Sequence, residues 1–183
     1  KEIIDHKLYG IPKKVFINFG FPHLPSADIR YNKGLSGGAL MDAGAYTISA
    51  VQELFPDNEL VYSSIDRQGY EVDVTGSAVF QTNDDIKCFL NWGFGLSYKN
   101  DIEVWTQDQH ILVERAFSKP ADYRAKISHS KNGKLSIDSD VPCNHFVQMF
   151  NYAFGLSNNQ YATINQKLCS QMEDIDCILR NGK

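Results

Sequence analysis

Asp42 and Tyr46 are four residues apart near the start of a predicted helix, so their side chains are expected to lie one above the other on one face. A carboxylate beside a phenol is a pair that can pass a proton to or from a substrate oxygen. Both residues also have structural interpretations, because the helix dipole favours an acid in a first turn and tyrosines commonly pack half-buried. The pair by itself therefore leaves chemistry and structure both open.

Three glycines accompany the pair. Gly37, Gly38 and Gly44 stand just before the predicted helix or on its first turn, where a helix-forming residue would otherwise be favoured. Glycine has no Cβ, so another backbone or a flat ring can approach it closely. We therefore expect a close approach at this segment.

Residues 37–46, Gly-Gly-Ala-Leu-Met-Asp-Ala-Gly-Ala-Tyr, resemble the Gly-Gly-Ala-Leu-x-Asp-x-Gly-x-Tyr/His signature of the Gfo/Idh/MocA oxidoreductases. The resemblance runs from the strand end at Phe19–Pro22, through Asp28-Ile29-Arg30, to the last helix. It implies that Tyr46 gives or takes a proton at the sugar oxygen that becomes or ceases to be a carbonyl. It also implies that Asp42 orients the substrate or assists that transfer.

The resemblance covers the C-terminal domain of the family. In that family an N-terminal Rossmann domain binds NAD or NADP, and the C-terminal α+β domain supplies an open sheet for oligomerisation and one wall of the active site. Residues 1–183 contain no Gly-x-Gly-x-x-Gly after a strand. We therefore expect the chain to be a substrate-binding and oligomerisation domain without its Rossmann partner, inactive alone and holding no cofactor.

Within the family, the sequence looks most like the ketoreductases of nucleotide-linked deoxysugars and the dihydrodiol dehydrogenase branch. Arg30 and Lys33 are candidates for contacting a phosphate or sugar hydroxyls, with solvated loop charges as the alternative. Asn91 and Trp92 are candidates for lining the pocket, although a tryptophan at such a position is commonly core. The expected substrate is a sugar or nucleotide sugar.

A second interpretation treats the chain as a non-catalytic binding and dimerisation module whose ancestral active site has lapsed. The presence of both Asp42 and Tyr46 argues against it.

Apolar periodicity indicates the elements that position these residues. Residues 13–21 alternate as a strand, and residues 39–55 carry apolar side chains at helical spacing. Further strands are predicted at 60–67, 70–81, 86–97, 102–106, 111–117, 123–130 and 135–137, and helices at 145–154 and 164–179. Short connections favour antiparallel neighbours. The prediction is an α+β fold, a large, mainly antiparallel, open-faced sheet with helices packed on one face.

Large side chains recur on both faces of several predicted strands, such as Phe89 beside Trp92. We therefore expect the open sheet face to pair with a second copy in a homodimer or higher homo-oligomer.

Composition excludes several classes of function. A net charge of -4 and a pI near 5.7 give no basic field for nucleic acid, and no apolar run is long enough to cross a membrane. The four cysteines lack zinc-site spacing, so no metal is expected. Free thiols and the absence of an Asn-x-Ser/Thr sequon favour a cytoplasmic protein.

Overall fold

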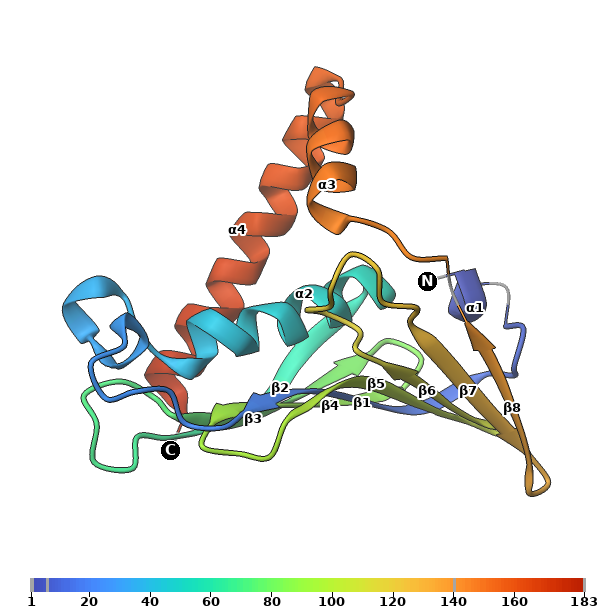
Figure 1. The fold of residues 1–183 in the computed structure, drawn as a ribbon, viewed down its shortest axis with the longest axis horizontal. Helices are drawn as coiled ribbons and strands as arrows, with labels where there is room; N and C mark the ends of the chain where they lie inside the picture. Colours follow the sequence, from blue (N-terminus) through green and yellow to red (C-terminus); the bar gives the residue numbers. More distant parts are fainter. Residues whose placement is uncertain (1, 6, 140, 183) are drawn as a thin grey trace.

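The computed structural model describes residues 2–5, 7–139 and 141–182 as a curved sheet with helices above one face and a helical arm rising from it (Figure 1). The sheet has eight strands in the order β2-β3-β4-β1-β5-β6-β7-β8. They are β1 (Pro12–Phe21), β2 (Asn58–Asp66), β3 (Thr75–Thr82), β4 (Lys87–Phe94), β5 (Lys99–Thr106), β6 (His110–Glu114), β7 (Lys126–Lys131) and β8 (Lys134–Ser139). The predicted α+β class with a mainly antiparallel sheet is confirmed.

One strand pair departs from the antiparallel pattern. β1 runs parallel to β4, with Ile17 opposite Leu90 and Phe19 opposite Trp92. A parallel pair requires a long crossover. Here that crossover contains a helix and two strands, so the short turns read from the sequence did not reveal it.

The helical elements divide into a group that covers the sheet and a group that leaves it. They are α1 (Glu2–Asp5), the short η1 (Ile29–Tyr31) and η2 (Lys33–Leu35), the π-helical η3 (Leu40–Gly44), α2 (Ala45–Leu54), α3 (His145–Phe154) and α4 (Asn158–Asn181). α2 and the C-terminal part of α4 pack together over the strands, where Ile48, Val51, Ile175 and Ile178 are buried. Burying each such side chain stabilises the fold by about 1.5–3 kcal/mol.

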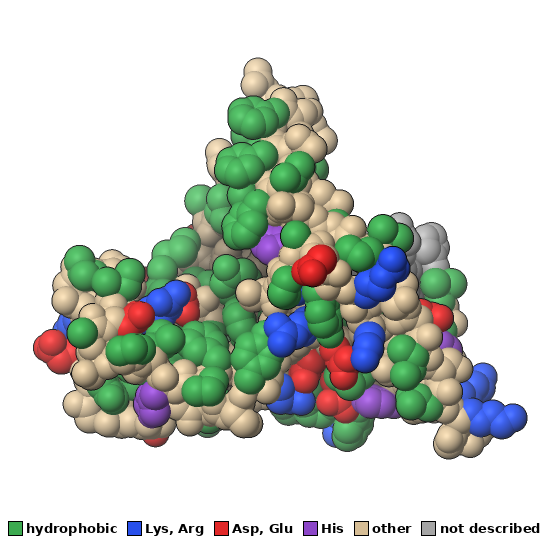
Figure 2. Space-filling view, viewed as in Figure 1, with side chains coloured by type: hydrophobic (Ala, Val, Ile, Leu, Met, Phe, Trp, Pro, Cys, Tyr) green, Lys and Arg blue, Asp and Glu red, His purple; other side chains and the backbone are tan. Residues whose placement is uncertain are grey.

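An arm, formed by α3 and the N-terminal part of α4, rises from the helix-covered side of the sheet and is not packed on the strands. α3 contains no buried residue, and Phe154 is 86% exposed. Residues 141–166 contain no Asp, Glu, Lys or Arg. Figure 2 shows the resulting hydrophobic surface on the arm.

The opposite face of the sheet is open and carries two rows of side chains. An apolar row crosses four strands through Tyr62, Val79, Phe89 and Phe16, which are successive cross-strand neighbours. The Phe16 and Phe89 rings stack with their centroids 5.1 Å apart. Beside it runs a polar row, in which Ser77, Asn91, Asn18 and Asp101 are joined by side-chain hydrogen bonds.

Candidate functional site

The helix that carries Asp42 and Tyr46 is anchored at its start by Asp73. The Asp73 carboxylate accepts a hydrogen bond of 2.6 Å from the backbone N–H of Leu40, and the Asp73 carbonyl accepts one of 2.9 Å from Ala39. An acidic group at a helix N-terminus satisfies unpaired N–H groups and complements the dipole. Burial raises the pKa of Asp73 above its ordinary value, and the Leu40 hydrogen bond opposes that rise. Sequence reasoning missed Asp73 because it lies some thirty positions away from the helix it caps.

The first turn is wider than an α-helical turn. Ala45 N–H donates to the Leu40 carbonyl, five residues back, which makes residues 40–44 a π-helix. Single π turns inside helices are frequent at functional sites. A Cβ added to Gly44 would lie 3.0 Å from the Trp92 indole, so the flat ring that approaches this glycine belongs to the protein's own core.

Gly37 and Gly38 also lie against other residues of this chain. A Cβ on Gly37 would lie 2.5 Å from the Arg30 carbonyl oxygen. Gly38 has φ +124°, a backbone conformation that favours glycine, and it faces the Asp73 carboxylate. The glycines therefore let the 28–38 loop pack tightly against the start of the helix.

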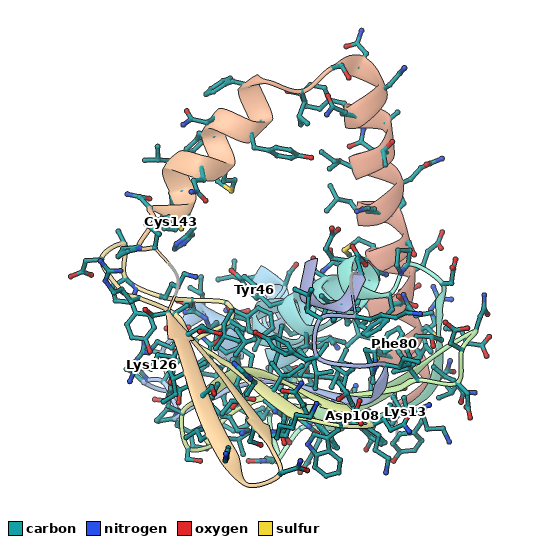
Figure 3. All side chains as sticks on the ribbon, turned by 90° about the vertical axis from the view of Figure 1, so that its right-hand side faces the viewer. Lys13, Tyr46, Phe80, Asp108, Lys126 and Cys143 are labelled. Carbon is teal, nitrogen blue, oxygen red and sulfur yellow. The ribbon has the colours of Figure 1, made fainter. Side chains whose placement is uncertain are left out.

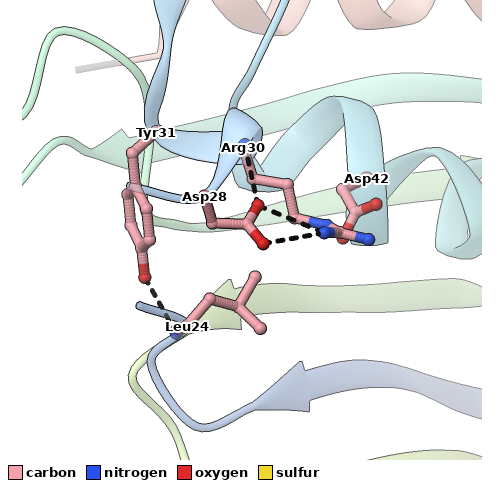
Figure 4. Close-up of polar contacts among 5 residues, drawn as sticks. All are labelled: Leu24, Asp28, Arg30, Tyr31 and Asp42. Carbon is pink, nitrogen blue, oxygen red and sulfur yellow. Dashed lines mark hydrogen bonds and ion pairs between the residues drawn. The ribbon is translucent and has the colours of Figure 1, made fainter. Parts of the chain in front are cut away.

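Arg30 ties this loop to Asp42 (Figure 4). Its Nε donates to Asp42 Oδ2 at 2.8 Å, and its Nη1 donates to Asp28 Oδ1 at 3.2 Å. The hydrogen bond to Asp42 raises the pKa of Arg30. The backbone N–H of Arg30 bonds the Asp28 carboxylate and lowers its pKa. Arg30 is thus already paired with two carboxylates.

Asp42 and Tyr46 open onto one shared pocket of about 280 Å³. Its lining residues are Phe19, Phe21, Arg30, Asp42, Tyr46, Tyr98 and Ser118. Tyr46 is 52% exposed, and its ring meets Phe19 edge-on at 5.6 Å between centroids. Figure 3 shows Tyr46 at the surface of the body below the arm. The acid and the phenol are therefore both available to a ligand from the same side.

The far wall of the pocket is held by a buried residue that the sequence did not indicate. The Asn100 side chain donates to the Tyr98 hydroxyl at 3.1 Å and to the Ser118 carbonyl at 3.0 Å, and it accepts the Phe117 N–H at 2.9 Å. Phe117 in turn lies 6.0 Å from the Tyr46 ring. One amide thus fixes two pocket-lining residues and a ring beside Tyr46.

The other predicted site residues lie elsewhere. Lys33 is exposed on η2 and does not line this pocket. Asn91 belongs to the polar row on the open face, because side chains alternate along a strand and its neighbour Trp92 points toward the helices. Trp92 is 1% exposed, as a core residue. The prediction that Asn91 and Trp92 line the pocket is corrected accordingly.

Comparison with known proteins adds an independent observation. Residues 1–112 match the model of the GFO/IDH/MocA C-terminal domain, which is more than half of the chain. The chain belongs to this family.

Curated relatives of this GFO/IDH/MocA domain include sugar-modifying oxidoreductases. A dTDP-3,4-didehydro-2,6-dideoxy-alpha-D-glucose 3-reductase from Saccharopolyspora spinosa is 38% identical over 117 residues, covering 63% of this chain and 35% of the relative. The D-xylose 1-dehydrogenase (NADP(+)) 2 of Haloferax volcanii is 25% identical over 148 residues, covering 79% and 45%. The chain thus spans less than half the length of either relative.

The crystal structure of KijD10, a 3-ketoreductase from Actinomadura kijaniata in complex with NADP and TDP-benzene, has the same fold. The match has a TM-score of 0.89 and 23% sequence identity, and it covers 100% of this chain and 57% of KijD10. The fold of the GFO/IDH/MocA domain, including the arm, therefore occurs in a longer protein.

Two features are absent from the residues of this GFO/IDH/MocA domain that the structure describes. No group of three or more His, Cys, Asp or Glu side chains is placed to hold a metal ion. Over the same residues, none of the helices has the length and apolar character needed to cross a membrane.

Proposed function

We propose that residues 1–183 form the C-terminal substrate domain of an NAD(P)-dependent oxidoreductase that acts on a carbonyl or hydroxyl carbon of a sugar, in particular a nucleotide-linked deoxysugar. The observation that carries the proposal is the pocket lined by both Tyr46 and Asp42, with Tyr46 half-exposed. The dTDP-sugar reductases among the relatives support the substrate class, and the NADP in KijD10 supports the cofactor.

In this proposal the cofactor is held by a domain outside residues 1–183. A nicotinamide would supply or accept the hydride, but residues 1–183 contain no Gly-x-Gly-x-x-Gly motif after a strand to hold its phosphates. The open pocket with aromatic walls, Phe19 and Phe21, leaves room for a flat ring delivered by a second domain. We place that domain upstream of residue 1.

This chain's own residues move the proton. In the reductive direction, the carbonyl carbon receives hydride while the Tyr46 hydroxyl donates its proton to the carbonyl oxygen, which becomes the alcohol. Asp42 accepts a hydrogen bond from a neighbouring sugar hydroxyl and so orients the ring. Arg30 keeps the Asp42 carboxylate in place through the 2.8 Å hydrogen bond.

The test uses the full-length protein with purified substrates. NADPH oxidation is expected with a dTDP-linked 3-keto deoxysugar, at a kcat/KM at least tenfold above that for the unlinked sugar. Oxidation is measured by the loss of NADPH absorbance, with the 183-residue chain as the inactive control. Equal rates with and without dTDP would contradict the substrate class, and no rate with any ketosugar would contradict the reaction.

We further propose that the open sheet face pairs with a second copy. Phe16→Glu places a charge at one end of the apolar row, against the Phe89 ring, and is expected to shift the protein from dimer to monomer, because an unpaired buried charge is costly. Sedimentation velocity at equal concentrations checks the result. Tyr152→Glu, on the arm, is the matched control and should leave the dimer intact. Dissociation by Tyr152→Glu alone would assign the interface to the arm.

A further inference from the structure

Arg115 lies immediately after β6 and extends the candidate site in one direction. Its guanidinium carbon is 5.0 Å from the centroid of the Tyr98 ring and 5.3 Å from that of the Tyr123 ring. Cation–π contact of this kind orients a guanidinium on an aromatic surface. Tyr98 also lines the pocket of Tyr46. Arg115 therefore contacts a ring that belongs to the wall of the candidate site.

The charge of Arg115 is unbalanced. Within residues 2–5, 7–139 and 141–182, no carboxylate lies within ion-pair distance of its guanidinium, whereas Arg30 has two carboxylate partners and Arg180 has one. The surrounding segment, residues 115–125, holds two further cations, Lys119 and Arg124, and a single acid, Asp122. Figure 2 shows Lys and Arg side chains on this face of the body, below the arm, with Asp and Glu side chains among them.

A guanidinium held flat and without a carboxylate offers its N–H fork to a planar or tetrahedral anion. Arg pairs with phosphate through two parallel hydrogen bonds, which are stronger than neutral ones. Arg30 cannot serve in this way through Nε and Nη1, because both already donate to Asp28 and Asp42. Among the described residues, Arg115 is a cation close to the pocket whose guanidinium forms no ion pair with a carboxylate.

Resting on the proposed function, we propose that Arg115 binds the diphosphate of the nucleotide-linked sugar. The sugar lies over Asp42 and Tyr46, the chain of the ligand passes along the Tyr98 ring, and the diphosphate meets the guanidinium at the far side of that ring. Asn100 acts as a positioning residue, since its hydrogen bond to the Tyr98 hydroxyl keeps the shared ring in place.

The test compares two competitive inhibitors of the full-length protein, dTDP and thymidine. Arg115→Met keeps an apolar stem over the rings but removes the charge, so the inhibition constant for dTDP is expected to rise about 10- to 100-fold. Thymidine lacks the phosphates, and its inhibition constant should stay within about twofold by the same reasoning. Arg124→Met makes the same chemical change in the same segment and should leave both constants within that range.

The outcomes separate the subsite from the reaction. If Tyr46→Phe lowers turnover but Arg115→Met leaves dTDP binding unchanged, the reaction stands and the subsite is overturned. If Arg115→Met weakens dTDP and thymidine equally, Arg115 is structural and the proposal also falls. If the protein reduces free sugars and dTDP does not inhibit, the nucleotide-linked substrate class itself fails. Selective loss of dTDP affinity in Arg115→Met supports both the Arg115 subsite and the nucleotide-linked substrate class.

Discussion

Tyr46→Phe in the full-length protein is expected to lower kcat at least tenfold, and by as much as about 10²- to 10⁴-fold if proton transfer limits turnover. The substitution removes only the hydroxyl. The ring keeps its edge contact with Phe19 at 5.6 Å and its neighbour Phe117 at 6.0 Å, so the packing of the pocket is preserved. Stopped-flow or steady-state NADPH oxidation gives kcat, and thermal unfolding shows that the fold is intact.

The comparison variant for this experiment is Tyr70→Phe. Tyr70 is partly exposed and stacks on Tyr31 at 4.8 Å, away from the pocket lining. Its hydroxyl is removed by the same change, so turnover should stay within about twofold, the range expected of an uninvolved surface position. A Tyr46→Phe protein that turns over at the rate of Tyr70→Phe would rule out Tyr46 as the acid.

Trp92→Ala is expected to lower the free energy of unfolding by about 3–5 kcal/mol, the usual cost of removing a large aromatic side chain from a core. Trp92 is 1% exposed and fills the space between Gly44 on the helix and Gly76 on β3. Its loss leaves a cavity directly beneath the turn that carries Asp42, so weaker substrate binding should accompany the lower stability. Equilibrium urea denaturation measures the first effect.

Asn91, which precedes Trp92 in the sequence, supplies the control variant for Trp92→Ala. Asn91→Ala removes a side chain from the opposite face, where it is exposed and bonded to Asn18 at 2.9 Å. Its hydrogen bonds to Asn18 and Ser77 are both lost, so the cost should be about 1–3 kcal/mol, the net value of two hydrogen bonds, with kcat and KM unchanged. Equal destabilisation by Trp92→Ala and Asn91→Ala would show that the indole is not a central core residue.

Local periodicity predicted strands such as β1 and β4 well because each has one face packed on the core. The range 145–154 is reproduced by α3 to the residue, since Asn144 caps it by accepting the Phe146 N–H. Strand β3 begins at Thr75 instead of 70, because the preceding residues turn to bring Asp73 to the helix start. α4 begins at Asn158, earlier than predicted, and the Ser157–Gln160 capping box is the signal that was overlooked.

The candidate site could be predicted only where its parts are near in sequence. Asp42 and Tyr46 share one helix, and Arg30 reaches Asp42 from twelve positions away. Asn100 reaches the pocket wall because β5 pairs with β1, where Phe19 lies opposite Asn100, and no spacing rule encodes a pairing at that sequence separation. The position of the arm could not be predicted from the sequence either. An apolar helix face predicts that the helix is covered, but not which surface covers it.

The central position of β1 governs the order in which the domain can be built during translation. Among the eight strands of this sheet β1 leaves the ribosome first, yet its two partners, β4 (Lys87–Phe94) and β5 (Lys99–Thr106), are made only some 70 to 90 residues later. Until then both edges of β1 lack a strand to pair with, a state that exposes a nascent chain to aggregation. Pairing at such sequence separation also slows folding. Truncated products that stop before Ile102 would leave Val15 and Ile17 without their cross-strand neighbours on at least one side, which makes them candidates for chaperone capture or degradation.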